Sequence, residues 1–543
     1  MSRRLALTSA SLLVGLSTLL AWSAQAPAVA GGPTTLRVAY GSYPDYMDPQ
    51  LSYTAEGWSA MGEVYIPLLT FRHTSGKAGT EVVPGLARSM PRVSDGGRTY
   101  TLFLQPGLEY SDGTPVRATD FEYAIERLFR MRSGGAPLYS VIVGAPRYSR
   151  TGRGGIAGIV ADNRTGRIVI HLRRASSTFP DLLALMFAAP VPPTTPLHDQ
   201  SSHPPPATGP YVIGRSRPGI GWSYARNPAW AAHNEARVPQ VPSGHVDKIE
   251  VHVIRDPYAE VSEVLAGKID WMQNPPPAPL VQELAERYKG TQLRFEQSPS
   301  TYYFWLNTTR PPFNDVRVRR AVNYAVDANA LQRIYFGQLT PTHEILPPSM
   351  PGYGGFDLYP YDLAKARRMI AAAHPRDRRV TVWTDTESQN LEAGKYFAAV
   401  LRRLGFHAHV KVVSSDNYFT AIGNSATPNL DAGWADWFQD FPHPDDFFRP
   451  QLLGSSIQPV NNYNLSRIDV PALNAKINHL STLPLSPTTE RHYTALDRSF
   501  MKLAPWVPFG TQTLTTFVSS RVDLDKVVSS PVFYEYLTSF ELR

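Results

Sequence analysis

Alternating apolar and polar residues predict several short strands along the chain. Tyr100, Leu102 and Leu104 fall on one face of a strand expected over 98–105. The same two-residue period predicts strands over 167–172 and 247–254. Because segments with a helical period lie between these strands, the pattern indicates an α/β protein with mixed sheets and flanking helices.

Capping residues mark the starts of three predicted helices. Thr119 and Glu122 have the spacing of a capping box. The apolar side of the helix that follows is expected to comprise Phe121, Ile125, Leu128 and Phe129. Asp315 and Asp362 are expected to cap two later helices, because an aspartate there accepts a hydrogen bond from a free backbone N–H group.

The N-terminus has the layout of a secretory signal peptide, which we expect over 1–32. Two arginines precede an apolar run over 5–22, and small residues offer cleavage after Ala26 or Ala30. The alternative is that this segment is retained and anchors the protein in the membrane. No later segment is long and apolar enough to be expected to cross a bilayer.

Composition narrows the class of protein further. Hydrophobic residues make up 43% of the chain, which is ample for a large core. At 543 residues the chain is too long for one ordinary domain. The chain has no cysteine, which excludes disulfides, thiolate metal sites, cysteine nucleophiles and a lipidated cysteine. The formal net charge of +7 falls to +5 without the two signal-segment arginines. Since no long Lys/Arg run or nucleic-acid motif is present, nucleic-acid binding is not expected.

One segment carries a family resemblance. Residues 84–129 read PGLARSMPRVSDGGRTYTLFLQPGLEYSDGTPVRATDFEYAIERLF, which resembles the solute-binding proteins of ABC peptide and nickel importers, family 5. Further segments similar to that family follow in the same order: 36–41, Met47-Asp48-Pro49, 63–71, 207–212, 226–228 with Trp230, 267–270, Asn307, 312–321, and Trp437 with 440–442 and Pro444. Together they cover nearly all of the mature chain.

The resemblance implies a two-lobed, periplasmic-binding-protein-like fold of type II, of the large cluster with an extra subdomain and a hinge. Its expected boundaries are lobe I at 34–69, 186–295 and 506–543, an inserted subdomain II at 70–185, and lobe III at 296–505.

The resemblance also implies a function. We expect the exported substrate-binding component of an ABC importer, which holds a small solute, an oligo- or dipeptide, between its lobes and delivers it to a membrane permease. The chain has no phosphate-binding loop, so the ATPase is expected to be another chain. We expect a monomer, periplasmic or at the cell surface, without a cofactor. An oligosaccharide or metal-chelate binder is the alternative on this fold.

A secreted hydrolase is the alternative from another class. Such an enzyme needs a nucleophile–base pair or a metal cluster, and the sequence offers neither a Gly-x-Ser-x-Gly elbow nor a His-Glu-x-x-His motif. The pair His407 and His409 has a spacing that can chelate a metal. We favour an exposed strand there, and we expect neither a metal site nor a catalytic one.

The ligand site is expected around Trp437 and Asp440. In peptide binders of the family, the acid of the W-x-x-D run forms a salt bridge with the peptide α-amino group, which implies this role for Asp440 and a wall position for Trp437. Asp436 offers a rival register, and a purely structural loop acid is the other alternative.

Three tyrosines are further candidates for the ligand site. Tyr43 and Tyr46 follow the first strand, in a loop that borders the cleft in the family. Tyr303 lies near an inferred crossing between the lobes, where the alternative is a strand residue that packs in the core.

Overall fold

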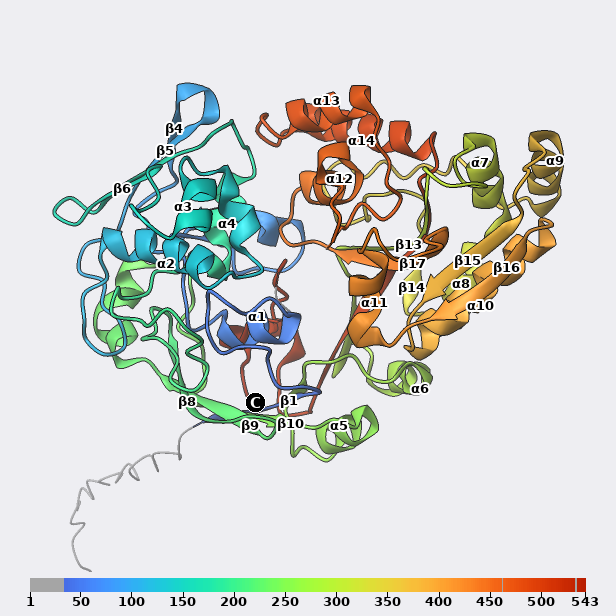
Figure 1. Cartoon of the computed structure of the whole chain (residues 1–543). Coiled ribbons are helices and arrows are strands. Elements are labelled where there is room, and N and C mark those ends of the chain that lie inside the picture. The colour runs from blue at the N-terminus through green and yellow to red at the C-terminus, as the bar shows by residue number, and fades with distance from the viewer. Residues whose placement is uncertain (1–33, 461, 533–534) are drawn as a thin grey trace, which may run out of the picture.

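The chain forms two lobes (Figure 1), and its described residues build two large hydrophobic cores and a smaller third cluster in lobe I. The computed structural model describes residues 34–460, 462–532 and 535–543, so the expected signal peptide lies outside the described residues. One core joins lobe I and subdomain II. The other lies within lobe III and spans Tyr302 to Phe509. The fold is therefore two-lobed, as expected.

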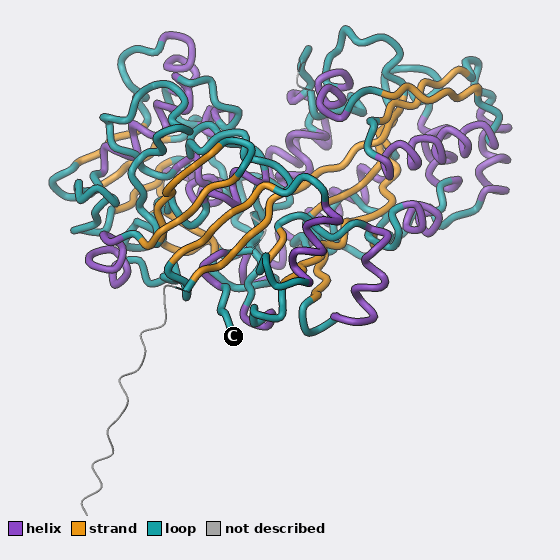
Figure 2. The backbone as a smooth tube through the Cα atoms, turned by 90° about the horizontal axis from the view of Figure 1, so that it is seen from below, coloured by secondary structure: helices purple, strands orange, loops and turns teal. Residues whose placement is uncertain are grey.

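A mixed sheet of twelve strands runs through both lobes (Figure 2). The strand order is β16-β15-β17-β13-β18-β11-β1-β10-β9-β8, and β12 and β14 pair with β18. These strands are β1 (Thr35–Tyr40), β8 (Tyr211–Arg217), β9 (Gly221–Arg226), β10 (Lys248–Val253), β11 (Trp271–Met272), β12 (Leu293–Gln297), β13 (Ser300–Leu306), β14 (Leu339–Thr340), β15 (Arg379–Thr384), β16 (His407–Val412), β17 (Ala432–Phe438) and β18 (Trp506–Val518).

Helices cover the lobes on either side of this sheet. In lobe I they are α1 (Ala55–Met61), α5 (Pro257–Leu265) and α6 (Ala278–Tyr288). In lobe III they are α7 (Val316–Ala325), α8 (Ala328–Ile334), α9 (Leu363–Ala373), α10 (Ser388–Arg403), α11 (Ser415–Ile422), α12 (Asp445–Leu452), α13 (Pro471–Leu480) and α14 (Pro487–Met501). Among the described residues, none of the helices is both long and apolar enough to cross a membrane.

The chain crosses between the lobes along two hydrogen-bonded strands. The start of β18 pairs with β13 in lobe III, and its end pairs with β11 and β12 in lobe I. Residues 506–510, which the expected boundary at 505/506 assigns to lobe I, pair with β13 of lobe III. Residues 296 and 297, which the expected boundary assigns to lobe III, belong to β12 and pair with β18 within lobe I. At the crossing itself, Ser298 N donates to Gln512 O over 2.8 Å.

Subdomain II contains a separate four-stranded sheet in the order β4-β5-β7-β6. Its elements, with the adjoining hairpin, are β2 (Leu69–Phe71), β3 (Val82–Pro84), β4 (Arg92–Ser94), β5 (Thr99–Phe103), β6 (Ile159–Asp162), β7 (Arg167–His171), α2 (Ala118–Arg130), α3 (Ala145–Thr151) and α4 (Phe179–Ala184). The predicted strands over 98–105 and 167–172 are confirmed as β5, which is shorter at both ends, and β7, which ends one residue earlier.

The predicted capping box at the start of α2 is displaced. The helix begins at Ala118, so Asp120 occupies the third position and accepts a hydrogen bond from Arg117 N over 2.8 Å. The Thr119 hydroxyl instead donates to Asn163 over 3.2 Å. The apolar side was predicted correctly, because Phe121 and the other three residues are buried.

A fully buried ion pair ties subdomain II to lobe I. The Arg127 guanidinium, on α2, donates to both carboxylate oxygens of Asp48, each over 2.6 Å. Neither side chain is accessible to solvent. Gln50 N and Gln200 N also donate to this carboxylate. The pair joins segments 79 residues apart and fixes the loop between β1 and α1.

Candidate functional site

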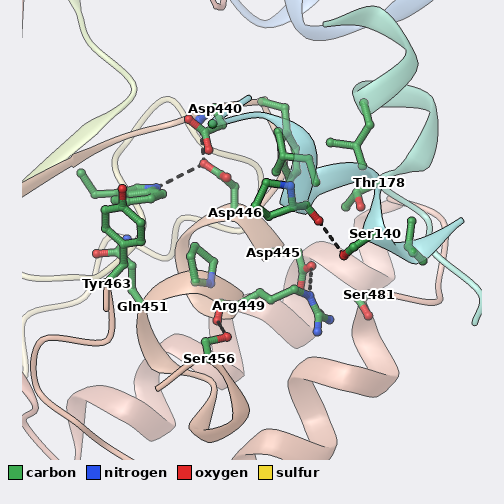
Figure 3. A pocket seen from close by; sticks show the side chains of 18 of the residues that line it. Ser140, Thr178, Asp440, Asp445, Asp446, Arg449, Gln451, Ser456, Tyr463 and Ser481 are labelled. Carbon is green, nitrogen blue, oxygen red and sulfur yellow. Dashed lines mark hydrogen bonds and ion pairs between the residues drawn. The ribbon is translucent and has the colours of Figure 1, made fainter. Parts of the chain in front are cut away.

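A cavity of about 990 Å³ lies between lobe III and subdomain II. The loop after β17 and helix α12 line one side (Figure 3). Residues within the segments 132–141 and 174–182 of subdomain II line the other, and Tyr53 enters from lobe I. This volume is at the upper end of the range for small-molecule pockets.

The Asp440 carboxylate faces this cavity at the junction of the lobes. Tyr53 Oη donates to Asp440 Oδ2 over 3.0 Å. The backbone N of Asp440 and Trp437 Nε1 both donate to Asp446 Oδ2, over 2.9 and 3.2 Å. Asp446 lies in the first turn of α12 and thereby fixes the loop that presents Asp440.

Burial makes ionisation of these acids costly. It raises the pKa of Asp440 to about 6, partly offset by the hydrogen bond from Tyr53. It also raises the pKa of Asp446, which lies close enough to Asp440 for the two negative charges to repel. None of the ion pairs between described residues includes Asp440 or Asp446. In the described part of the protein, no ion pair compensates the Asp440 carboxylate when it is ionised, which is the electrostatic setting for a cationic group.

Asp436 and Tyr303 also line the cavity. Burial and the charge of Asp385 raise the pKa of Asp436 to about 7. Tyr303 is only 1% exposed, its ring stacks on Trp506, and its hydroxyl donates to Gln451 Oε1 over 2.8 Å. Tyr303 therefore belongs chiefly to the core of lobe III, whereas Asp436 remains open to a ligand.

Tyr43 and Tyr46 are not among the residues that line the cavity. Tyr43 contacts Ser216 through its hydroxyl and packs edge-on against Trp222, so it belongs to the β8–β9 side of lobe I. Tyr46 is 38% exposed. The loop after β1 does reach the cavity, but through Tyr53, whose ring stacks on Trp58. No local sequence pattern indicates this contact, because it depends on how the lobes meet.

The two lobes touch on both sides of the cavity. The backbone N and the hydroxyl of Ser177 both donate to Ser481 O, over 2.8 and 2.9 Å. On the other side, Gln439 Nε2 donates to Pro531 O over 2.7 Å. With the Tyr53–Asp440 bond, these hydrogen bonds join the lobes around the cavity.

The paired histidines lie apart from this site. His407 and His409 are exposed on β16, as the exposed-strand interpretation predicts. Nowhere in the described ranges do three or more His, Cys, Asp or Glu residues gather as a metal site would require.

Known families and structures resemble the chain over most of its length. The model of bacterial extracellular solute-binding proteins, family 5 (middle region), matches residues 81–458. Heme-binding protein A of Haemophilus influenzae is 24% identical, over 94% of this chain and 93% of its own. Probable di/tripeptide-binding protein 5 of Pseudomonas aeruginosa is also 24% identical, over 81% of this chain and 84% of its own.

Solved structures share the fold. Clavulanic acid biosynthesis oligopeptide binding protein 2 superposes with a TM-score of 0.86 at 27% identity, over 94% of this chain and 95% of its own. A periplasmic binding protein of Helicobacter pylori in complex with the peptide STSA gives a TM-score of 0.72 at 20% identity, over 94% and 98% of the two chains.

Proposed function

The chain belongs to the bacterial extracellular solute-binding proteins of family 5, and on this premise we propose that its cargo is a short peptide with a free amino terminus. The observation that carries the proposal is the Asp440 carboxylate, which faces the cavity between the lobes and forms no ion pair with any described residue. An enclosed ammonium needs such a carboxylate, because its desolvation is otherwise uncompensated.

The walls around Asp440 suit varied peptide side chains. Trp437, Tyr53 and Tyr463 present aromatic surface beside it. Flat rings pack against side chains of many shapes, while the few polar groups fix the ligand's orientation. Two relatives named for peptide binding are consistent with this choice of cargo.

Binding and delivery follow from the two-lobed design. Family 5 proteins bind solutes outside the cell membrane and work with the permease and ATPase of an ABC importer. Ligand binding favours the closed form by its higher affinity for that form. We expect this chain to act as a monomer without catalysis, exported by its signal segment and without a lipid tether because it has no cysteine.

Scattering with a peptide pool tests the proposal. With a randomised tripeptide pool we expect a smaller radius of gyration than without ligand, and the retained peptides should be recovered uncleaved. An oligosaccharide mixture is the control. Closure with the oligosaccharides and not with the peptides would contradict the peptide assignment, and cleavage of the pool would favour the hydrolase alternative.

The affinity for an ammonium ligand should depend on pH. Because a bound ammonium favours the ionised carboxylate, the pKa of Asp440 in the complex must lie below its value of about 6 in the free protein. Affinity is therefore full above the pKa of Asp440 in the free protein and falls by up to about tenfold per pH unit below it. Calorimetry at about pH 7.5 and about pH 5 measures the effect. Equal affinities at both would show that Asp440 does not pair with the ligand.

A further inference from the structure

Positive charge is concentrated in subdomain II. Residues 70–185 contain sixteen Arg and Lys against nine Asp and Glu, a formal net charge of +7, whereas the rest of the range 34–543 carries −2. Fifteen of the sixteen are arginines. Within the described chain, ion pairs engage three of these arginines: Arg72, Arg98 and Arg127. The subdomain therefore presents many guanidinium groups that no ion pair neutralises.

The four-stranded sheet of this subdomain has one face open to solvent. Alternate residues of β5 and β7 are buried in the core that also contains the apolar side of α2: Tyr100, Leu102, Ile168 and Ile170. The residues between them occupy the opposite face, because successive side chains of a strand point to opposite sides. On that face Phe103 is 38% exposed, and Val160 of the edge strand β6 is 53% exposed. The helices of the subdomain thus leave this face uncovered.

Strand register gathers three exposed arginines on the open face. Arg167 lies opposite Phe103. Arg88 N donates to Phe103 O, and the Arg88 guanidinium lies 5.9 Å from the centre of the Phe103 ring. In the neighbouring row, β4 contributes Arg92 and β6 contributes Val160. We call these five residues the basic face: Arg88, Arg92, Phe103, Val160 and Arg167.

An acid beside the basic face is committed to its own turn. Asp162 lies opposite Arg167 in the register. Its carboxylate accepts hydrogen bonds from Arg164 N over 2.9 Å and from the Thr165 hydroxyl over 2.7 Å, so it holds the β6–β7 turn. A partner of the basic face must therefore supply anionic groups, and it must also accommodate the exposed Phe103 ring.

An anionic lipid surface meets both requirements. Guanidinium groups donate paired hydrogen bonds to phosphate, and an aromatic ring beside them can enter the boundary between headgroups and acyl chains. Family 5 proteins work with a membrane permease, and this chain lacks the cysteine that would carry a lipid tether. We propose that the basic face binds the surface of a membrane that contains anionic phospholipids, and thereby keeps the protein close to its permease.

The basic face lies apart from the ligand cavity. None of its five residues lines the cavity. In Figure 1 the strands β4, β5 and β6 lie at the outer edge of subdomain II, away from lobe III. The face is therefore available to a membrane whether or not a solute is bound, and the inference does not depend on the identity of the cargo.

Sedimentation of the mature protein with two kinds of vesicle tests the inference. The protein should sediment with phosphatidylcholine vesicles that contain about a third phosphatidylglycerol, and not with pure phosphatidylcholine vesicles. Raising the salt concentration from about 0.05 M to about 0.5 M should release it. Each arginine near an anionic surface contributes about fivefold in affinity, so the triple variant Arg88→Gln, Arg92→Gln, Arg167→Gln should bind about a hundredfold more weakly.

The matched control removes three exposed arginines from the helical side of the same subdomain. The changes are Arg147→Gln, Arg150→Gln and Arg153→Gln, in α3 and directly after it. This variant should keep its affinity for the anionic vesicles within about threefold, because its arginines do not face the lipid. Thermal unfolding midpoints equal to that of the unmodified protein would show that both triple variants fold. Equal losses of vesicle binding in the two variants, or equal binding to the two kinds of vesicle, would overturn the inference.

Phe103→Ser separates a lipid surface from another polyanion. It should weaken binding to the anionic vesicles at least about threefold and leave binding to soluble polyglutamate unchanged, since only the vesicle offers an apolar boundary to the ring. Polyglutamate bound as tightly as the vesicles, with no effect of Phe103→Ser on either, would assign the face to an acidic polymer and overturn the membrane assignment. Affinity for the tripeptide pool is a separate measurement, so the proposed function stands or falls independently of these results.

Discussion

Replacing Asp440 with asparagine should lower the affinity for a free-terminus peptide at least a hundredfold. The substitution keeps the shape of the side chain and removes the charge that an enclosed ammonium needs. Removing one partner of a buried ion pair costs about 3–5 kcal/mol, which corresponds to a factor of a hundred or more. Calorimetry with the most strongly retained tripeptide measures the loss.

Asp436→Asn is the comparison variant for Asp440→Asn. Asp436 lines the same cavity and offers the rival register for the ammonium. If Asp436→Asn loses affinity and Asp440→Asn does not, the ammonium pairs with Asp436 on β17 and not with Asp440 in the loop after this strand. If neither variant loses affinity, both acids are structural and the peptide is held in some other way.

Replacing Arg127 with methionine should destabilise the protein by about 3–5 kcal/mol. The change would leave the Asp48 carboxylate buried without its cation, since neither side chain of this pair is accessible to solvent. The pair joins α2 to the loop after β1, and both segments belong to one hydrophobic core. Urea unfolding of the mature protein measures the loss in the transition that exposes this core.

Arg130→Met is the matched control for this variant. Arg130 lies one turn further along α2, is exposed, and donates to Gly152 O over 3.2 Å. Its loss should cost less than about 1 kcal/mol. Adding Asp48→Asn to Arg127→Met should restore part of the stability, because no unpaired charge then remains buried. Equal losses for Arg127→Met and Arg130→Met would contradict the role assigned to the pair.

Local patterns predicted the elements of the fold. The strand expected over 247–254 is confirmed as β10, which pairs in parallel with β1. Asp315 and Asp362 do cap α7 and α9, since each accepts a hydrogen bond from a backbone N–H group of its helix. These features depend on neighbouring residues alone, so the local sequence is sufficient to predict them.

Contacts between distant segments could not be predicted in this way. Asp48 and Arg127 both lie in segments that carry the family resemblance, yet nothing local indicates that they meet. The sequence analysis predicted Tyr43 as a site residue and not Tyr53. The direction of the loop after β1 depends on the Asp48–Arg127 pair and on how the lobes meet.

The affinity of the unmodified protein for one tripeptide, with its amino terminus free and then acetylated, tests most directly whether the cavity is a peptide site. Because we propose that the free ammonium pairs with Asp440, we expect acetylation to lower the affinity at least a hundredfold at a pH above the carboxylate's pKa of about 6. Equal affinity for both forms would contradict the peptide assignment.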